Sequence, residues 1–348
     1  ALLSYEDAAG WSAMIQEVVQ EKRMPPWHAD PQFGKFSNDR SLPKEDRETL
    51  LNWIAAGCPK GETKDMPPPR EWPEGWRIGK PDMVLTMPQP YDVPAQPPKG
   101  GIPYQHFFID PGFTEDRWVT RAEARAGAPE VVHHVIVFIL TPGKFFNQND
   151  PTNPVLCGTA PGDMPLVLPD GMAKRIPAGS KLVLQTHYTP NGRAQKDLSR
   201  IGIIFSPAPP KHEVRSIPVT NPIFRIPPGD DNFKHEANYT LRRDALAINF
   251  MPHMHLRGKD FLYEAVYPDG KAETLLSVPN YNFNWQSVYR LVEPKPLPKG
   301  TRIHAVAHFD NSAKNPNNPD PTKAVFWGDQ TWEEMMIGWF DIAWELKP

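Results

Sequence analysis

Five histidines are the residues of this chain whose types and spacing could do chemistry. His133 and His134 are adjacent, His253 and His255 are separated by one residue, and His187 lies between the two pairs along the chain. All five stand in short apolar segments that are typical of β-strands. Imidazole is a good ligand for copper, zinc, iron and nickel. The pattern therefore predicts bound transition metal.

The spaced pair is arranged to share one ion. Side chains at positions i and i+2 of a strand project from the same face, so the imidazoles of His253 and His255 can reach one metal together. Met335, on a later strand, would add a thioether, a soft ligand that favours Cu(I) over zinc. A single methionine in an apolar strand is more often a core residue, so the prediction depends first on the two histidines.

The adjacent pair needs a distortion before it can act in the same way. On an ideal strand His133 and His134 point to opposite faces, so joint ligation requires a twist, a bulge or the use of different ring nitrogens. His187 follows the apolar run 182–184 and would complete a site of three imidazoles from two strands. Gln185 shares a strand face with His187, which would place its amide near the metal. A purely structural role for the adjacent pair stays open.

The elements that must position these residues are mainly β-strands. The chain has 348 residues, 43 of them proline, yet its hydrophobic content of 39% is too high for a disordered chain. Short apolar runs separated by turn signals predict a mainly β protein with two tandem sandwiches, over residues 78–212 and 213–348. A helical segment over residues 1–66 and a proline-rich linker over 67–77 precede them.

Two helices are predicted in the N-terminal segment. The first starts at the capping-box-like Ser4 and is expected to end before Pro25, since the residue before proline avoids helical backbone angles. The second is predicted between Ser41 and Gly57.

Charge and hydropathy exclude several classes of partner. A net charge of −3 and a pI near 6.4 provide no basic surface for nucleic acid. No apolar stretch approaches the roughly 18 residues that a membrane-spanning helix needs. Two cysteines, Cys58 and Cys157, allow one disulfide or two free thiols. The start at Ala1 is typical of a mature or trimmed chain.

Four motifs together resemble the type II copper, ascorbate-dependent monooxygenases, which include peptidylglycine α-hydroxylating and dopamine β-monooxygenases. The motifs are Val132-His133-His134-Val135, Leu184-Gln185-Thr186-His187-Tyr188, His253-Met254-His255-Leu256 and Glu334-Met335. Their order and approximate spacing agree over residues 78–348. The similarity is greatest to bacterial relatives, through the segment Pro252–Lys259 and the later Asn284-Trp285-Gln286.

The resemblance implies two jelly-roll domains, each with one copper, that face each other across a solvent-filled cleft. It divides the ligands into two sets, His133, His134 and His187 for an electron-storing copper, and His253, His255 and Met335 for the copper that binds dioxygen and substrate. The implied reaction is hydroxylation of a C–H bond of a small organic molecule, with O2 and two electrons from an external donor.

The surroundings of the second set differ from those of the peptide-amidating members. Those enzymes hold a substrate carboxylate with an arginine, an asparagine and a tyrosine, where this chain has Met251, Ile337 and Trp339. An unpaired carboxylate there would cost roughly several kcal/mol. We therefore expect a neutral, partly apolar or aromatic substrate bounded by these three side chains.

The helical segment resembles the C-terminal part of a c-type cytochrome domain, with Met24 at the place of the axial methionine. The Cys-x-x-Cys-His motif is absent, so this chain cannot attach haem by that motif. The segment is either the end of a longer haem-containing parent, which we favour, or a structural remnant. The electron donor would be ascorbate or a c-type haem. Such chemistry predicts an exported, periplasmic protein.

Two other functions remain open at this point. The first is a copper-binding or electron-transfer protein that performs no hydroxylation. The second is a zinc hydrolase that uses His133, His134 and His187 and leaves one position for water. The hydrolase leaves Met335 unexplained, and no glutamate base accompanies the three histidines in sequence.

Overall fold

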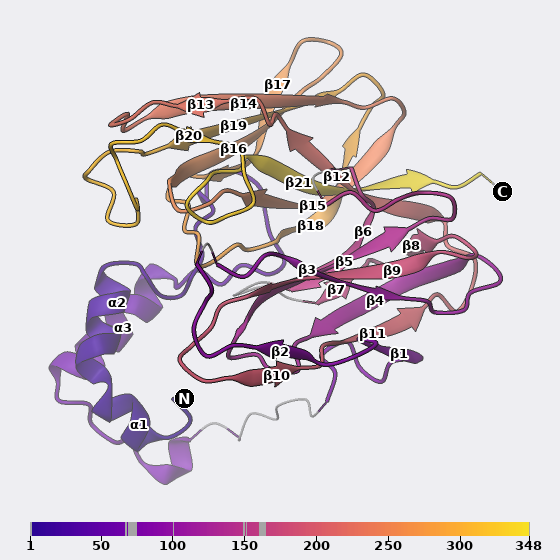
Figure 1. Cartoon of the computed structure of the whole chain (residues 1–348). Helices are drawn as coiled ribbons and strands as arrows, with labels where there is room; N and C mark the ends of the chain where they lie inside the picture. Colours follow the sequence, from indigo (N-terminus) through magenta and orange to yellow (C-terminus); the bar gives the residue numbers. More distant parts are fainter. Residues whose placement is uncertain are drawn as a thin grey trace. The chain divides into compact units, whose positions relative to one another are not determined.

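The computed structural model describes residues 2–66, 68, 75–99, 101–148, 150, 152–159 and 165–347 (Figure 1). The chain divides into two compact units. The helical unit combines Ala1–His28 with Asn38–Pro73, and the β unit combines Ala29–Ser37 with Glu74–Pro348. The segment 29–37, expected within the helical part, belongs to the β unit through an isolated bridge between Phe36 and Leu291. Most of the predicted linker, residues 67 and 69–74, lies outside the described residues.

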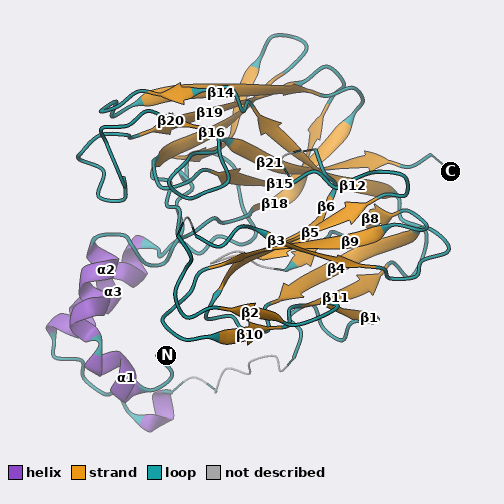
Figure 2. Cartoon of the chain, viewed as in Figure 1, coloured by secondary structure: helices purple, strands orange, loops and turns teal. Residues whose placement is uncertain are grey.

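Among the described residues, helices are confined to the N-terminal part of the chain (Figure 2). They are α1 (Tyr5–Gly10), α2 (Ser12–Gln20), α3 (Lys44–Ala55) and the short 3-10 helix η1 (Thr63–Asp65). The side chain of Ser4 accepts a hydrogen bond from the backbone N–H of Asp7 at 3.0 Å, as the capping pattern predicts. The first predicted helix is divided at Trp11, and it ends near Lys22, whose φ of 57° is left-handed.

The first sandwich is built from the strands that precede residue 212. These strands are β1 (Met83–Thr86), β2 (Tyr91–Val93), β3 (Gln105–Ile109), β4 (Arg117–Arg125), β5 (Val132–Leu140), β6 (Val155–Thr159), β7 (Leu166–Val167), β8 (Met172–Ile176), β9 (Lys181–Tyr188), β10 (Gln195–Asp197) and β11 (Arg200–Phe205). One layer has the order β3-β9-β5-β6, and the other contains β1-β11-β4-β8.

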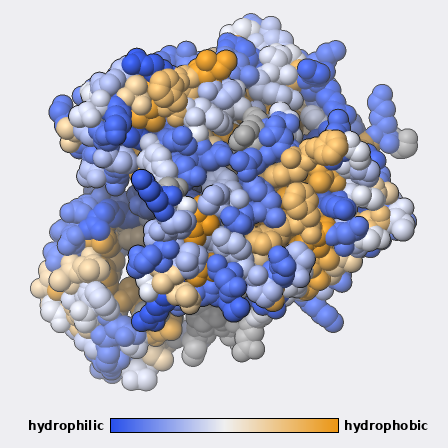
Figure 3. Space-filling view, in the orientation of Figure 1, coloured by the Kyte–Doolittle hydropathy of each residue, from blue (hydrophilic) through white to orange (hydrophobic). Residues whose placement is uncertain are grey.

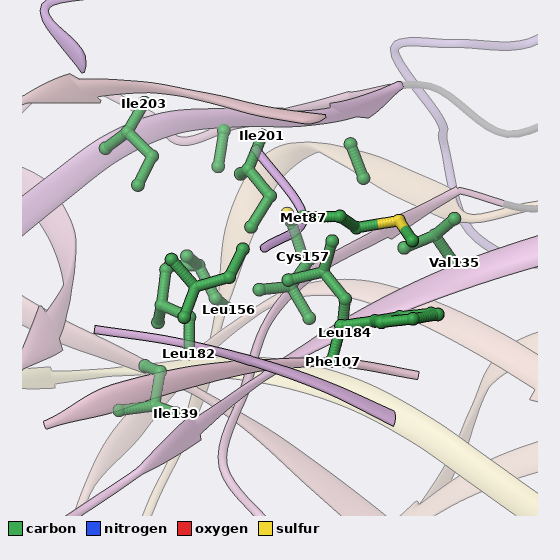
Figure 4. Close-up of a cluster of buried hydrophobic side chains, with 14 of the residues drawn as sticks. Met87, Phe107, Val135, Ile139, Leu156, Cys157, Leu182, Leu184, Ile201 and Ile203 are labelled. Atoms are coloured by element: carbon green, nitrogen blue, oxygen red, sulfur yellow. The ribbon is translucent and has the colours of Figure 1, made fainter. Parts of the chain in front are cut away.

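Alternating apolar residues fill the space between these two layers. Val135, Val137 and Ile139 of β5 pack in one cluster with Ile201 and Ile203 of β11, and all five are at most 5% exposed. Figure 4 shows part of this cluster, with side chains from several strands converging. The alternate positions of β5, including His134, face the other way. The core therefore sets which face of the sheet carries the predicted ligands.

The second sandwich begins at His212, and the six residues 206–211 separate it from the end of β11. Its strands are β12 (His212–Thr220), β13 (Arg225–Ile226), β14 (Phe233–Thr240), β15 (Ala245–His253), β16 (Gly258–Val266), β17 (Ala272–Val278), β18 (Tyr289–Leu297), β19 (Arg302–Phe309), β20 (Val325–Phe326) and β21 (Ile337–Glu345). The layer β14-β19-β16-β17 covers the layer β12-β21-β15-β18. Phe250 stacks on Phe340 in one layer and packs against Tyr263 of the other, and Tyr263 donates a hydrogen bond to the carbonyl oxygen of Trp339.

The two sandwiches share one continuous sheet. Strands β8 and β12 pair in parallel, which joins their layers into a nine-stranded sheet ordered β1-β11-β4-β8-β12-β21-β15-β18, with β7 paired to β4. Polar side chains cross this junction. Lys174 Nζ donates to Ser216 Oγ at 2.8 Å, Ser216 donates to Asp341, and Asn249 donates to the same carboxylate at 2.9 Å. Buried hydrogen bonds of this kind tie neighbouring strands together.

The predicted fold class is confirmed. The protein is mainly β, with two tandem jelly-roll β-sandwiches preceded in the chain by a small helical segment. Both cysteines are buried, and they are not joined in a disulfide. No helix among the described residues is long and apolar enough to cross a bilayer. Polar side chains cover most of the face drawn in Figure 3, with apolar ones gathered in limited areas.

Candidate metal centres

A β-bulge brings the adjacent histidines to one site. In the antiparallel pairing of β5 with β9, Val132 lies opposite Tyr188 and His134 lies opposite His187, so His133 is an extra residue in β5. An extra residue bends the strand and redirects the side chains around it. The distortion that joint ligation requires is therefore present in the backbone.

The three imidazoles have the spacing of metal ligands. One ring nitrogen from each of His133, His134 and His187 can be chosen so that all three lie within 4.8 Å of one another. The Nδ1 atoms of His133 and His134 are 3.3 Å apart. Two nitrogens at about 2.0–2.1 Å from one ion, at a tetrahedral angle, would be separated by about 3.3–3.4 Å. The residues present thus fit a transition metal.

Burial keeps these imidazoles neutral. It lowers the pKa of His133, brings that of His187 to about 4, and together with the neighbouring histidines holds the pKa of His134 well below its ordinary value. The Nε2 atom of His134 is buried without a hydrogen-bond partner. At neutral pH the three rings therefore retain nitrogen lone pairs, which metal binding requires.

Tyr104 forms a wall of this three-histidine group. Its ring packs edge-on against His134 and His187, with centroid distances of 5.5 and 5.0 Å. Its hydroxyl donates to the carbonyl oxygen of Asp329, in the second sandwich, at 2.9 Å. The sequence did not point to Tyr104, because its position beside His187 follows from the pairing of β3 with β9.

The second group lies at the end of β15. The rings of His253 and His255 are close, with centroids 5.3 Å apart, but only His253 is in the strand. Met335 is not on a strand either, because β21 begins at Ile337, which pairs with His253. If that register is extended past the strand ends, Met335 falls opposite His255. Met335 is 9% exposed.

Hydrogen bonds orient both rings of the second group. The Nδ1 of His253 is 2.6 Å from Gln286 Oε1, and the Nδ1 of His255 is 3.2 Å from the carbonyl oxygen of Glu333. Both partners are acceptors, so each Nδ1 donates and Nε2 keeps the lone pair for a metal. Burial lowers the pKa of His253 and brings that of His255 to about 3, so both rings are neutral at pH 7.

Glu334 anchors the backbone beside these ligands. Its carboxyl group, which is fully buried, accepts from the N–H groups of His255 at 2.8 Å and Arg257 at 2.7 Å. Burial raises the pKa of Glu334 to about 8, although these hydrogen bonds oppose the shift. The carboxyl group thereby ties the His255 turn to the segment that carries Met335.

The two groups are close to each other. The ring of Phe283 stacks on His133 with a centroid distance of 5.7 Å and an interplanar angle of 14°, and meets His255 edge-on at 6.0 Å. The proximity of His253 and His255 also contributes to the low pKa of His134. The resemblance implied a solvent-filled cleft between the groups, whereas this structure places an aromatic ring in contact with both.

The remaining predicted residues lie as follows. Gln185 does share a face of β9 with His187, but its amide nitrogen is 3.1 Å from His106 Nε2, a histidine outside both groups. Met251 pairs with Trp339 across β15 and β21, next to the pair of His253 with Ile337. Alternation along a strand puts these four side chains on one face. The predicted substrate residues thus adjoin the second group.

The sequence matches no model of a known protein family and no curated protein. Solved structures that it is similar to include an infectious bursal disease virus VP2 subviral particle, at 7% identity and a TM-score of 0.22, covering 76% of this chain and 73% of that chain. Two others are the STIV MCP, at 10% and 0.26 over 67% and 97%, and PNGF-II, at 10% and 0.30 over 76% and 66%. Likenesses this distant carry no argument about function.

Proposed function

We propose that this protein is a copper-dependent monooxygenase that hydroxylates a C–H bond of a small organic substrate. The observation that carries the proposal is the pair of facing groups. One ring nitrogen from each of three imidazoles of the first sandwich lies within 4.8 Å of the others, and Phe283 contacts one ring of this group and one ring of a second, two-imidazole group. The buried Met335 falls opposite His255 when the register of β15 with β21 is extended. Two adjacent sites with different donor sets match what a two-electron oxidation requires.

The donor sets favour copper. Imidazole alone accepts several metals, but a thioether beside two imidazoles favours Cu(I) over zinc. Within the part of the chain that the structure describes, the group of His133, His134 and His187 contains no carboxylate that could serve as the base of a zinc hydrolase. Copper bound in both groups would supply redox chemistry with O2, in which R–H, O2, two electrons and two protons become R–OH and water.

The protein's own residues would bind, orient and exclude water. Gln286 and the carbonyl oxygen of Glu333 accept hydrogen bonds from the Nδ1 atoms of His253 and His255, which orients the two rings. Tyr104 and Phe283 cover the first group with aromatic rings. Shielding from bulk water limits side reactions of oxidising intermediates.

The substrate would be neutral and partly apolar or aromatic. Met251, Ile337 and Trp339 lie on the strand face that also carries His253, and none of the three carries a positive charge that could neutralise a carboxylate. Ile337 is 7% exposed. A substrate carboxylate beside these side chains would lose its hydration without compensation.

The electron donor would be ascorbate or a c-type haem, and we propose that the protein acts after export to the periplasm. Met24, at the place of an axial ligand, is 42% exposed, and the chain has no Cys-x-x-Cys-His motif. A haem c would therefore belong only to a longer parent chain.

The test begins with copper content. Wild type should bind two coppers per chain, His187→Ala should lose one, and Met335→Leu should weaken Cu(I) binding in the second group while keeping the first. The loaded wild type should then consume O2 with a reductant and a neutral aromatic substrate, but not with a peptide that ends in a carboxylate. Two coppers without O2 consumption across neutral substrates would instead support an electron-transfer protein. One zinc per chain, bound equally by wild type and Met335→Leu, would support a hydrolase.

A further inference from the structure

One loop of the second sandwich is attached to the second histidine group at several points. This loop, residues 279–288, connects β17 to β18 and is called here the bridging loop. The hydroxyl of Tyr281 accepts from the backbone N–H of Met254 at 3.0 Å and donates to the carbonyl oxygen of Met254 at 2.8 Å. Gln286 bonds His253 Nδ1 from the other end of the loop. The residue between the two histidines and one of the imidazoles are thus both held by the loop.

The same loop reaches the first group through one side chain. Phe283 lies between Tyr281 and Gln286 in sequence, and its ring stacks almost parallel on His133. The ring also meets His255 edge-on. The packing is local and specific, since stacked and edge-on aromatic pairs are preferred geometries worth more than their buried area. Phe283 therefore contacts one predicted ligand of each group.

We infer that Phe283 is a positioning residue that couples the two metal sites, so that metal binding in one group strengthens metal binding in the other. This inference rests on the proposed function. An ion in the first group fixes the orientation of the His133 ring, and a fixed His133 ring holds Phe283. Phe283 then orders the bridging loop, and with it the hydrogen bonds that Gln286 and Tyr281 make to the second group.

The sign of the effect separates this coupling from plain electrostatics. Two cations in adjacent groups repel each other, so a purely through-space interaction lowers the affinity for the second ion. Ordering of a shared loop raises the affinity for the second ion. The binding of the first ion already includes the entropic cost of ordering the loop, so the second ion does not bear that cost again. The two effects therefore predict opposite deviations from independent binding.

The experiment compares the overall affinity for two Cu(I) ions with the product of the two single-site affinities. A chromophoric Cu(I) chelator of known affinity provides the competition. His187→Ala reports on the second site alone, and His255→Ala reports on the first. In wild type the overall constant should exceed the product by about fivefold or more, the lower end of ordinary site-to-site coupling. In Phe283→Leu, with the same two single-site variants made in that background, the excess should fall below about twofold.

Controls keep the result specific to the ring. Phe283→Tyr retains an aromatic ring and should retain the coupling. Trp285→Leu changes another aromatic residue of the same loop and should also retain it. Circular dichroism spectra and copper stoichiometry check that each variant is folded and loaded.

Each outcome decides one question. Two coppers with an overall constant equal to or below the product overturn the coupling and leave the proposed function standing. An excess that survives in Phe283→Leu also overturns the role of Phe283. Fewer than two coppers in wild type overturn the proposed function and the inference with it.

Discussion

The two histidine groups are held by different kinds of structure. His134 and His187 lie opposite each other in paired strands, and a bulge supplies His133. The second group lies where strands have ended, and its geometry depends on hydrogen bonds from Gln286, Glu333 and Glu334. The first group is therefore part of a sheet ladder, whereas the second is assembled by loops. We expect the first group to tolerate changes around it better than the second.

The largest expected effect is at Glu334. In Glu334→Ala the buried N–H groups of His255 and Arg257 lose their acceptor, at roughly 1–3 kcal/mol each. The free energy of unfolding should fall by roughly 2–6 kcal/mol, and the second group should lose copper while the first keeps it. Denaturant titration and metal analysis check this. Glu334→Gln keeps one acceptor oxygen, so its free energy of unfolding should lie between those of wild type and Glu334→Ala. An unchanged second site in Glu334→Ala would contradict assembly by the loops.

A smaller effect is expected at Gln286. Gln286→Leu keeps the approximate volume but removes the acceptor for His253 Nδ1. Loss of such a partner typically lowers metal affinity roughly 10–100-fold. Cu(I) competition should show this loss chiefly in the second group, with a change in the first group no larger than the coupling between the sites. The matched change in the first sandwich is Gln185→Leu, whose amide contacts His106, and this variant should leave both affinities within about twofold. Equal losses of Cu(I) affinity in Gln286→Leu and Gln185→Leu would contradict the difference between the two groups.

The pH dependence of the metal-free protein tests the burial of the first group. Burial brings the pKa of His187 from its ordinary value of 6.5 to about 4. Between these values the unfolded chain binds a proton that the folded protein does not, so the free energy of unfolding should fall as the pH falls from about 6.5 to 4. His187→Gln removes this contribution. The difference between wild type and variant should therefore be constant above pH 7 and should change below it. A difference that is independent of pH would show that His187 is accessible to water.

The smallest expected effect is at Tyr104. Tyr104→Phe keeps the ring against His134 and His187 and removes only the hydrogen bond to Asp329. The free energy of unfolding should fall by about 1 kcal/mol, with copper content unchanged. Tyr104→Ala should also weaken the first site, because it exposes both imidazoles. Thermal denaturation and metal analysis distinguish the two variants. Copper loss in Tyr104→Phe would show that the hydroxyl, and not the ring, supports the site.

Parts of this arrangement could be predicted from local patterns. Alternating apolar residues in β5 and β9 predicted strands, and the same alternation predicted that Gln185 and His187 share a face. The expectation that Met335 and His255 lie within strands was wrong. His255 follows the end of β15 by two residues, and Met335 precedes the start of β21 by two residues. Their segments are apolar, but local composition does not reveal where a ladder stops, because pairing depends on the partner strand.

The sequence alone establishes which side chains can bind metal and that the chain around them is rich in β-strands. Both can be established in this way because residue chemistry and period-two alternation are local properties. Only the tertiary structure decided that a bulge turns His133 toward His187, that Phe283 contacts both groups, and that β8 and β12 join the sandwiches. Those features depend on the register between strands that are distant in the chain, and on the bridging loop of the second sandwich, whose Phe283 contacts His133 of the first sandwich. No pattern within a single segment carries that information.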